Sequence, residues 1–131
     1  MTYRGEVIRK GLEAFTSAKA YYLELGKAHD YYQYLRNNVK GVSFDRQPGG
    51  GNSETKALAF DKEVQEITRE MYLLLEFLDW INQILDKLDT DEEIFIREKY
   101  VEGWTWQEMA ERHQMSIDQV RYRINRIIEE M

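Results

Sequence analysis

The feature that most constrains the fold is a heptad repeat of apolar residues between residues 57 and 88. Apolar residues recur there in alternating steps of three and four, which is typical of a helix that packs lengthwise against another helix. Four further apolar residues widen this stripe, so we expect the C-terminal helices or a second subunit to cover them. The repeat comprises Ala57, Phe60, Val64, Ile67, Met71, Leu74, Leu78, Ile81, Leu85 and Leu88, and the four additions are Leu75, Phe77, Trp80 and Ile84.

A partner helix is predicted over residues 3–38, where a weaker spacing of the same kind is interrupted at Arg36. Residues 41–53, GVSFDRQPGGGNS, combine glycines, proline and small polar residues, and therefore predict a loop. Two helices of similar length joined by a loop favour an antiparallel, coiled-coil-like hairpin. We therefore assign residues 1–89 to a long helical hairpin with a Gly-rich loop at 41–53.

The last 42 residues carry three helix-start signatures, in which a hydroxyl residue precedes Glu or Gln by three positions. The hydroxyl caps the third helical N–H, while the longer side chain reaches back to the cap residue. Gly103 suits the left-handed end of the first of these helices. The signatures are Thr90…Glu93, Thr105…Glu108 and Ser116…Gln119, and they predict three helices in residues 90–131.

The last predicted helix is strongly two-sided. Ile117, Val120, Ile124, Ile127 and Ile128 share one arc of the helical wheel, so this arc is expected to face the core. The opposite arc is polar, and between residues 117 and 127 three arginines face only one acid. Positive charge is therefore concentrated where a recognition helix of a helix-turn-helix would meet phosphates.

The segment EEIFIREKYVEGWTWQEMAERHQMSIDQVRYRINRIIEEM resembles region 4 of sigma-70-type factors. The shared pattern is an acidic first helix, Gly-x-(Thr/Ser), Glu-(Ile/Met)-Ala, Ser-x-x-x-Val-Arg and a trailing apolar helix. A long hairpin before such a module also resembles small phage and prophage transcriptional regulators of the ArpU/RinA type. One departure is His113-Gln114, where such modules usually place an apolar residue and glycine. This turn is therefore either strained or differently shaped.

The resemblance implies that the N-terminal half of the last helix enters the major groove of DNA. Base-edge contacts are then assigned to side chains that can pair with guanine, adenine or cytosine. Other polar side chains are assigned to phosphate contact and positioning. The first group is Asp118, Gln119, Arg121 and Tyr122, and the second is Thr105, Ser116, Arg123 and Arg126.

Several classes of function are disfavoured by composition. The chain has no cysteine and two separated histidines, so neither a metal site nor a disulfide is expected, and no cofactor is implied. It has no Gly-rich phosphate loop and no nucleophile with a nearby base, so we do not expect an enzyme. No signal-type segment and no run of 18 apolar residues is present, so we expect a cytoplasmic protein. Tyr22, Tyr32 and His29 are interpreted as packing residues on the seam of the hairpin.

The helical pattern and the resemblance to region 4 thus predict an all-α, sequence-specific DNA-binding transcriptional regulator, and the resemblance to the ArpU/RinA type implies that it acts on phage or prophage late genes. Its partners would be double-stranded DNA, RNA polymerase as a further candidate, and a second copy of the chain, with a dimer favoured. The net charge of −6 opposes strong nonspecific binding to DNA. Two alternatives stay open: a DNA-packaging protein like a phage small terminase, and a module that binds polymerase or sigma without touching DNA.

Overall fold

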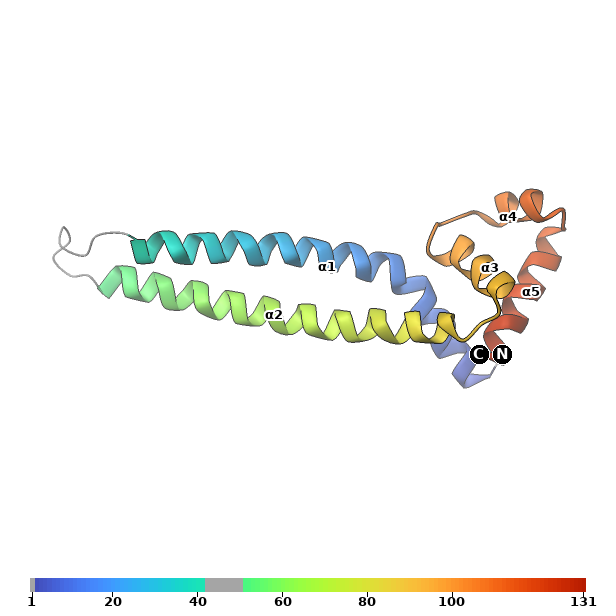
Figure 1. Ribbon diagram of the computed structural model, residues 1–131, viewed down its shortest axis with the longest axis horizontal. Coiled ribbons are helices and arrows are strands. Elements are labelled where there is room, and N and C mark those ends of the chain that lie inside the picture. The colour runs from blue at the N-terminus through green and yellow to red at the C-terminus, as the bar shows by residue number, and fades with distance from the viewer. Residues whose placement is uncertain (1, 42–50) are drawn as a thin grey trace. The chain divides into compact units, whose positions relative to one another are not determined.

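The computed structural model describes residues 2–41 and 51–131, and over these ranges the protein is helical and has no strand (Figure 1). The all-α class is therefore confirmed. Of the predicted loop at 41–53, residues 42–50 lie outside the described residues, whereas Gly41 and residues 51–53 are helical. The elements are α1 (Tyr3–Gly41), α2 (Gly51–Asp86), α3 (Thr90–Tyr100), α4 (Trp106–His113) and α5 (Ile117–Glu130).

The chain divides into two compact units, and each of the two long helices contributes to both. The helix-pair unit contains residues 20–76. The five-helix unit contains residues 1–19 and 77–131, so that it joins the start of α1 and the end of α2 to the three short helices. The division into functional modules at residues 89 and 90 stays a prediction.

In the helix-pair unit, α1 and α2 run antiparallel and pack together, as predicted (Figure 1). The Tyr21 hydroxyl donates a hydrogen bond to Glu70 at 3.0 Å, and Arg36 forms an ion pair with Asp61. The heptad position Ile67 is buried, but most other seam residues are only half-buried. Two helices alone therefore leave much of this seam in partial contact with water.

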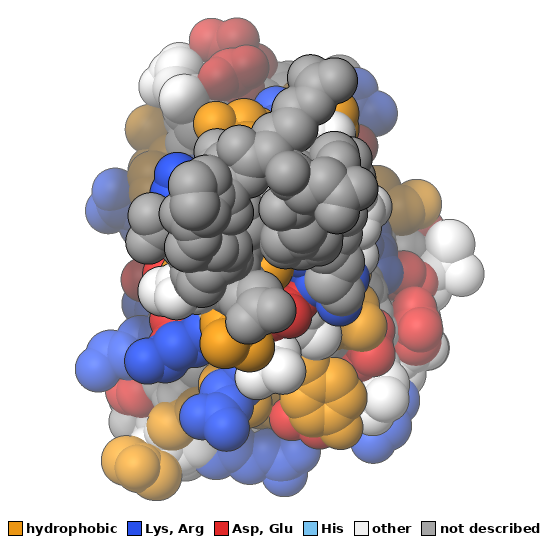
Figure 2. Space-filling view, turned by 90° about the vertical axis from the view of Figure 1, so that its left-hand side faces the viewer, with side chains coloured by type: hydrophobic (Ala, Val, Ile, Leu, Met, Phe, Trp, Pro, Cys, Tyr) orange, Lys and Arg blue, Asp and Glu red, His pale blue; other side chains and the backbone are white. Residues whose placement is uncertain are grey.

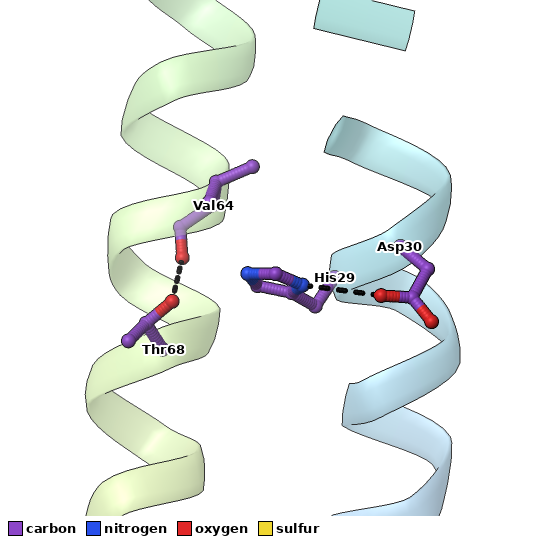
Figure 3. A network of polar contacts seen from close by, with 4 residues as sticks. All are labelled: His29, Asp30, Val64 and Thr68. Carbon is purple, nitrogen blue, oxygen red and sulfur yellow. Dashed lines mark hydrogen bonds and ion pairs between the residues drawn. The ribbon is translucent and has the colours of Figure 1, made fainter. Parts of the chain in front are cut away.

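His29 lies on this seam, and its ring extends from α1 toward the facing turn of α2 (Figure 3). Its Nδ1 lies 3.4 Å from the Asp30 carboxylate. On the facing helix, the Thr68 hydroxyl donates to the Val64 carbonyl at 2.7 Å, so this hydroxyl forms its hydrogen bond within α2. The predicted packing role of His29 agrees with this half-buried position.

Large hydrophobic side chains also reach the surface of the helix-pair unit. Leu23, Leu58, Tyr72 and Leu73 are all more than half exposed. On the face drawn in Figure 2, hydrophobic side chains lie among charged side chains of both signs. The expected cover by a second subunit therefore stays a prediction.

The core of the five-helix unit is built from all its segments. The first turns of α1 approach the end of α2 closely at Gly11, where an added Cβ would lie 2.9 Å from Ile81 Cδ1. Thr2 ties the two chain ends together, because its backbone N–H and its hydroxyl both donate to the Glu129 carboxylate. The buried apolar residues are Ile8, Leu12, Phe15, Leu78, Ile81, Leu85, Phe95, Ile96, Met109, Ala110, Val120, Ile124, Ile127 and Ile128.

A second tie joins α1 to α3, since the Thr16 hydroxyl donates to the Tyr100 carbonyl at 2.9 Å. Burial raises the pKa of the Tyr100 phenol, which favours its neutral form. The start of α1 is therefore part of the same packed body as the short helices.

Candidate nucleic-acid interface

The first short helix, α3, starts without the predicted capping box. Asp89 occupies the cap position, Thr90 is already the first helical residue, and no side chain caps the helix. The prediction for Thr90 and Glu93 was therefore wrong. The physical reason is register: with Thr90 as the first helical residue, Glu93 is the fourth and not the third, and it accepts a hydrogen bond from Arg97 at 2.9 Å one turn later. Arg97 also reaches Asp86 at 3.7 Å, which draws it toward the end of α2.

The link from α3 to α4 follows the sequence signals. Gly103 adopts φ +79°, the left-handed conformation expected at the end of α3. Thr105 then caps α4 with both hydrogen bonds of a capping box: its hydroxyl accepts from Glu108 N–H at 3.1 Å, and its own N–H donates to Glu108 Oε1 at 3.2 Å. This second predicted signature is confirmed, and it defines where α4 begins.

The turn between α4 and α5 resolves the question raised by the missing glycine. Gln114 has φ 54° and ψ 47°, and no other described non-glycine residue has positive φ. The turn thus keeps the left-handed shape and carries the strain of a side chain there. Ser116 caps α5, since its hydroxyl accepts from Gln119 N–H at 3.1 Å and its N–H donates to Gln119 Oε1 at 2.8 Å. The third signature is confirmed.

Helix α5 buries its isoleucine side as predicted. Val120, Ile124, Ile127 and Ile128 are at most 4 % exposed, and Ile117 at the start of the helix is half-buried. Helix α5 contacts both α4, where Met109 and Ala110 are buried, and α3, where Phe95 and Ile96 are buried. The small Ala110 side chain allows α4 and α5 to come close. The three short helices therefore form one packed group in which α5 turns its polar arc outward.

The structure brings most of the sequence-predicted site residues onto this outer side. Arg121 and Arg126 are both exposed cations on α5, and Arg126 contacts Glu130 one turn later at 3.2 Å. Hydrogen bonding to Glu130 raises the pKa of the Arg126 guanidinium, which is charged at any physiological pH. Asp118, Gln119 and Tyr122 are likewise exposed, and Tyr122 is 66 % accessible.

The remaining predicted residues have a second, structural use. Thr105 and Ser116 are exposed but are engaged as helix caps, so a phosphate would have to share their hydroxyls. Arg123 is half-buried, and its guanidinium lies 4.6 Å from the centre of the Phe95 ring. Their roles in DNA contact stay predictions.

One supporting residue lies outside the predicted site. Trp106 stands at the start of α4, and the Lys99 ammonium of α3 lies 4.4 Å from its ring centre. The Arg121 guanidinium lies 5.3 Å from the same ring centre. Burial lowers the pKa of Lys99, and its ammonium donates to the Trp104 carbonyl at 2.9 Å. A cation over an aromatic face is attracted by the ring quadrupole, so Trp106 holds Arg121 at the edge of the outer surface.

A buried carboxylate, Glu98, was missed altogether. It is 3 % exposed on α3, with Arg112 Nε at 3.0 Å and His113 Nε2 at 3.4 Å. These are ion-pair distances without hydrogen-bond geometry, and neither Glu98 oxygen accepts a hydrogen bond from the described residues. His113 also packs against Phe95, with ring centres 4.7 Å apart. His113 thus turns inward, toward Glu98 and Phe95.

Two features are absent from the part of the chain that the structure describes. Residues 2–41 and 51–131 bring together no group of three or more His, Asp or Glu side chains that would suit a metal ion. In the same ranges, none of the helices combines the length and apolar character that crossing a membrane requires.

Together, α4, the turn at Gln114 and α5 are consistent with a helix-turn-helix, supported by α3. Comparison with known families agrees with this class: residues 78–131 match the model described as Sigma-70, region 4. The match indicates a role in DNA binding or transcription regulation for this part of the chain. The comparisons with curated proteins and with solved structures gave no match. The likeness to regulators of the ArpU/RinA type stays a prediction.

Proposed function

We propose that this protein is a sequence-specific DNA-binding transcription regulator and that the outer side of α5 reads the duplex. The observation that carries the proposal is the two-sidedness of α5 within a segment that matches sigma-70 region 4. Its isoleucines are buried, while Arg121, Tyr122 and Arg126 are exposed. Arginine can pair with guanine edges, whereas the capped N-terminus of α5 provides a helix that can enter the major groove.

The charge of the chain sets how such binding would work. A net charge of −6 gives little long-range attraction to DNA, so affinity depends on the few cations placed at the interface. One small module makes few base contacts, and specific dissociation constants near 10⁻⁸ M usually need more. We propose that a second copy of the chain, or RNA polymerase, supplies them. The half-buried seam of the helix-pair unit supports the dimer.

The finer assignment is control of phage or prophage late genes. Its support is the combination of a long antiparallel helix pair with a region-4-like module, as in regulators of the ArpU/RinA type. Neighbouring genes that encode phage structural proteins would support it, and a setting without any phage gene would contradict it.

The test begins with selection of bound sequences from random 20-bp duplexes, followed by fluorescence anisotropy on the enriched site. The double variant Arg121→Ala/Arg126→Ala should bind at least tenfold more weakly, because the base contact assigned to Arg121 is worth about 1–3 kcal/mol and the phosphate contact assigned to Arg126 is lost as well. The matched control is Lys62→Ala/Arg69→Ala, which removes the same charge from exposed positions of the helix-pair unit. This control should bind like the unaltered protein.

Two other outcomes identify the alternatives. If no sequence is enriched and the full chain still binds RNA polymerase, the module is a protein-interaction domain and DNA reading is refuted. If light scattering shows a ring-sized assembly instead of a dimer, a DNA-packaging role is favoured. Equal affinity of the two double variants for the enriched site would mean that α5 does not face the duplex.

A further inference from the structure

A hollow of about 500 Å³ lies on the outer side of α5, directly on the surface proposed to face DNA. It is lined mainly by carbon atoms, although most of its residues are polar or charged. The lining residues are Met115, Asp118, Gln119, Tyr122, Arg123 and Arg126. Five of them are on α5, whereas Met115 comes from the turn just before the Ser116 cap. Met115 was not among the site residues predicted from the sequence.

The position of Met115 is fixed by the turn. Its N–H donates to the Ala110 carbonyl at 3.0 Å, so the backbone is held to the end of α4. Its side chain is half-buried and contributes to the same hollow as the exposed Tyr122 ring. The Arg123 guanidinium lies over the Phe95 ring, 4.6 Å from its centre, and this contact keeps the positive charge away from the open side of the hollow. An apolar concavity is thus left among charged neighbours.

We propose that this hollow receives the 5-methyl group of thymine, with Met115 and Tyr122 as the residues that select for it. The proposal rests on the function proposed above. Among the base edges in the major groove, thymine alone presents a methyl group, while the others present hydrogen-bond donors and acceptors. The thymine methyl group is therefore the apolar feature of this groove that the walls of such a hollow can contact.

Charge complementarity favours DNA over an apolar protein segment as the occupant. The exposed cations Arg121 and Arg126 lie on the same helix as the hollow, and they suit the phosphates or guanines beside a thymine. Asp118 at the rim can accept a hydrogen bond from an exocyclic amino group of a neighbouring base. Methionine is unbranched and polarizable, so its side chain can fit closely around a methyl group.

The experiment uses the full chain and the site enriched from random 20-bp duplexes. Each thymine is replaced in turn by 2′-deoxyuridine, which removes the methyl group and keeps the base pair. At one or more positions the affinity should fall about fourfold, as expected for one buried methyl group. With Met115→Ala this difference should disappear, whereas Met115→Leu, which keeps an apolar side chain of similar size, should retain it.

Tyr122→Ala provides a second variant, because Tyr122 is 66 % exposed and its removal should leave folding intact. It should also reduce the preference for thymine over uracil. Circular dichroism of each variant confirms its helix content.

Several outcomes would overturn the proposal and separate it from the function on which it rests. If thymine and uracil sites bind equally while Arg121→Ala/Arg126→Ala still weakens binding, DNA reading stands and the thymine pocket does not. If Met115→Ala leaves DNA affinity unchanged but weakens binding to RNA polymerase, the hollow is a protein contact. If the unaltered chain binds no duplex at all, both proposals fail together.

Discussion

Replacing Gln114 by glycine should stabilise the five-helix unit. Gln114 is the left-handed residue of the turn between α4 and α5, with φ 54° and ψ 47°. Its N–H donates to the carbonyls of Ala110 and Glu111, so the turn depends on its backbone, and its side chain forms no hydrogen bond with the residues that the structure describes. Glycine would keep these backbone contacts and remove the Cβ that makes the conformation unfavourable.

Two opposing contributions set the magnitude. The left-handed conformation costs a residue with a Cβ roughly 1–2 kcal/mol. Glycine loses more conformational freedom on folding, which costs about 0.5–1 kcal/mol. The free energy of unfolding should therefore rise by about 0.5–1 kcal/mol in Gln114→Gly. In Gln114→Ala the Cβ remains, so stability should change little.

The assay is urea unfolding followed by tryptophan fluorescence. All three tryptophans, at positions 80, 104 and 106, belong to the five-helix unit, so the signal reports on this unit alone. The control pair is Gln83→Gly and Gln83→Ala, at an exposed position near the end of α2. There the backbone is helical, and glycine should be less stable than alanine by about 1 kcal/mol.

The diagnostic quantity is the sign of the difference in unfolding free energy between the glycine and alanine variants at each position. The glycine variant should be the more stable of the two at position 114 and the less stable at position 83. If glycine is also the less stable residue at position 114, then that turn does not hold a strained left-handed residue and our account of it is wrong.

Three more perturbations test other parts of the unit. Trp106→Ala should weaken DNA binding two- to fivefold, because Arg121 loses an attraction of about 0.5–1 kcal/mol to the ring. Trp106→Phe keeps an aromatic ring and should weaken binding less. Equal DNA affinity of the two variants and the unaltered protein in fluorescence anisotropy would refute this. Glu98→Ala should lower the free energy of unfolding by about 1–2 kcal/mol. This loss is smaller than for a fully buried ion pair, because Arg112 is 57 % exposed. Urea unfolding should show a smaller loss of unfolding free energy for Glu98→Gln than for Glu98→Ala. Deleting residues 1–19 should expose the core of the five-helix unit and broaden its amide NMR spectrum, whereas a sharp, dispersed spectrum would show that residues 77–131 fold alone.

Local signals in the sequence were reliable where a motif was complete within a few residues. The caps at Thr105 and Ser116 formed because each residue lies at the N-cap, with its Glu or Gln at the third helical position. Thr90 carried the same signature and failed, since α3 begins one residue earlier than expected, with Asp89 at the N-cap. A capping motif therefore predicts that a helix begins nearby, but not which residue caps it.

Periodicity predicted which faces would be buried but not against which partner. Residues 3–38 were assigned to the partner helix of a hairpin, whereas Phe15 of that helix is buried in the unit that also contains the short helices. The close approach at Gly11 and the bonds from Thr2 to Glu129 join residues distant in sequence. No spacing rule within one helix encodes such contacts, because a heptad stripe is equally satisfied by any apolar partner.

In the candidate site too, the sequence predicted which residues face outward but not which residues of other helices they contact. The outward residues of α5 followed from its helical wheel, but the contacts that support this surface from α3 and α4 did not. The Trp106 ring of α4 lies beneath Arg121 of α5, and the Glu98 carboxylate of α3 lies against Arg112 of α4. A reading surface with so few cations depends on this support, because a displaced guanidinium loses its bidentate pairing with a base. If DNA reading is correct, variants at these two supporting residues should weaken specific binding more than nonspecific binding.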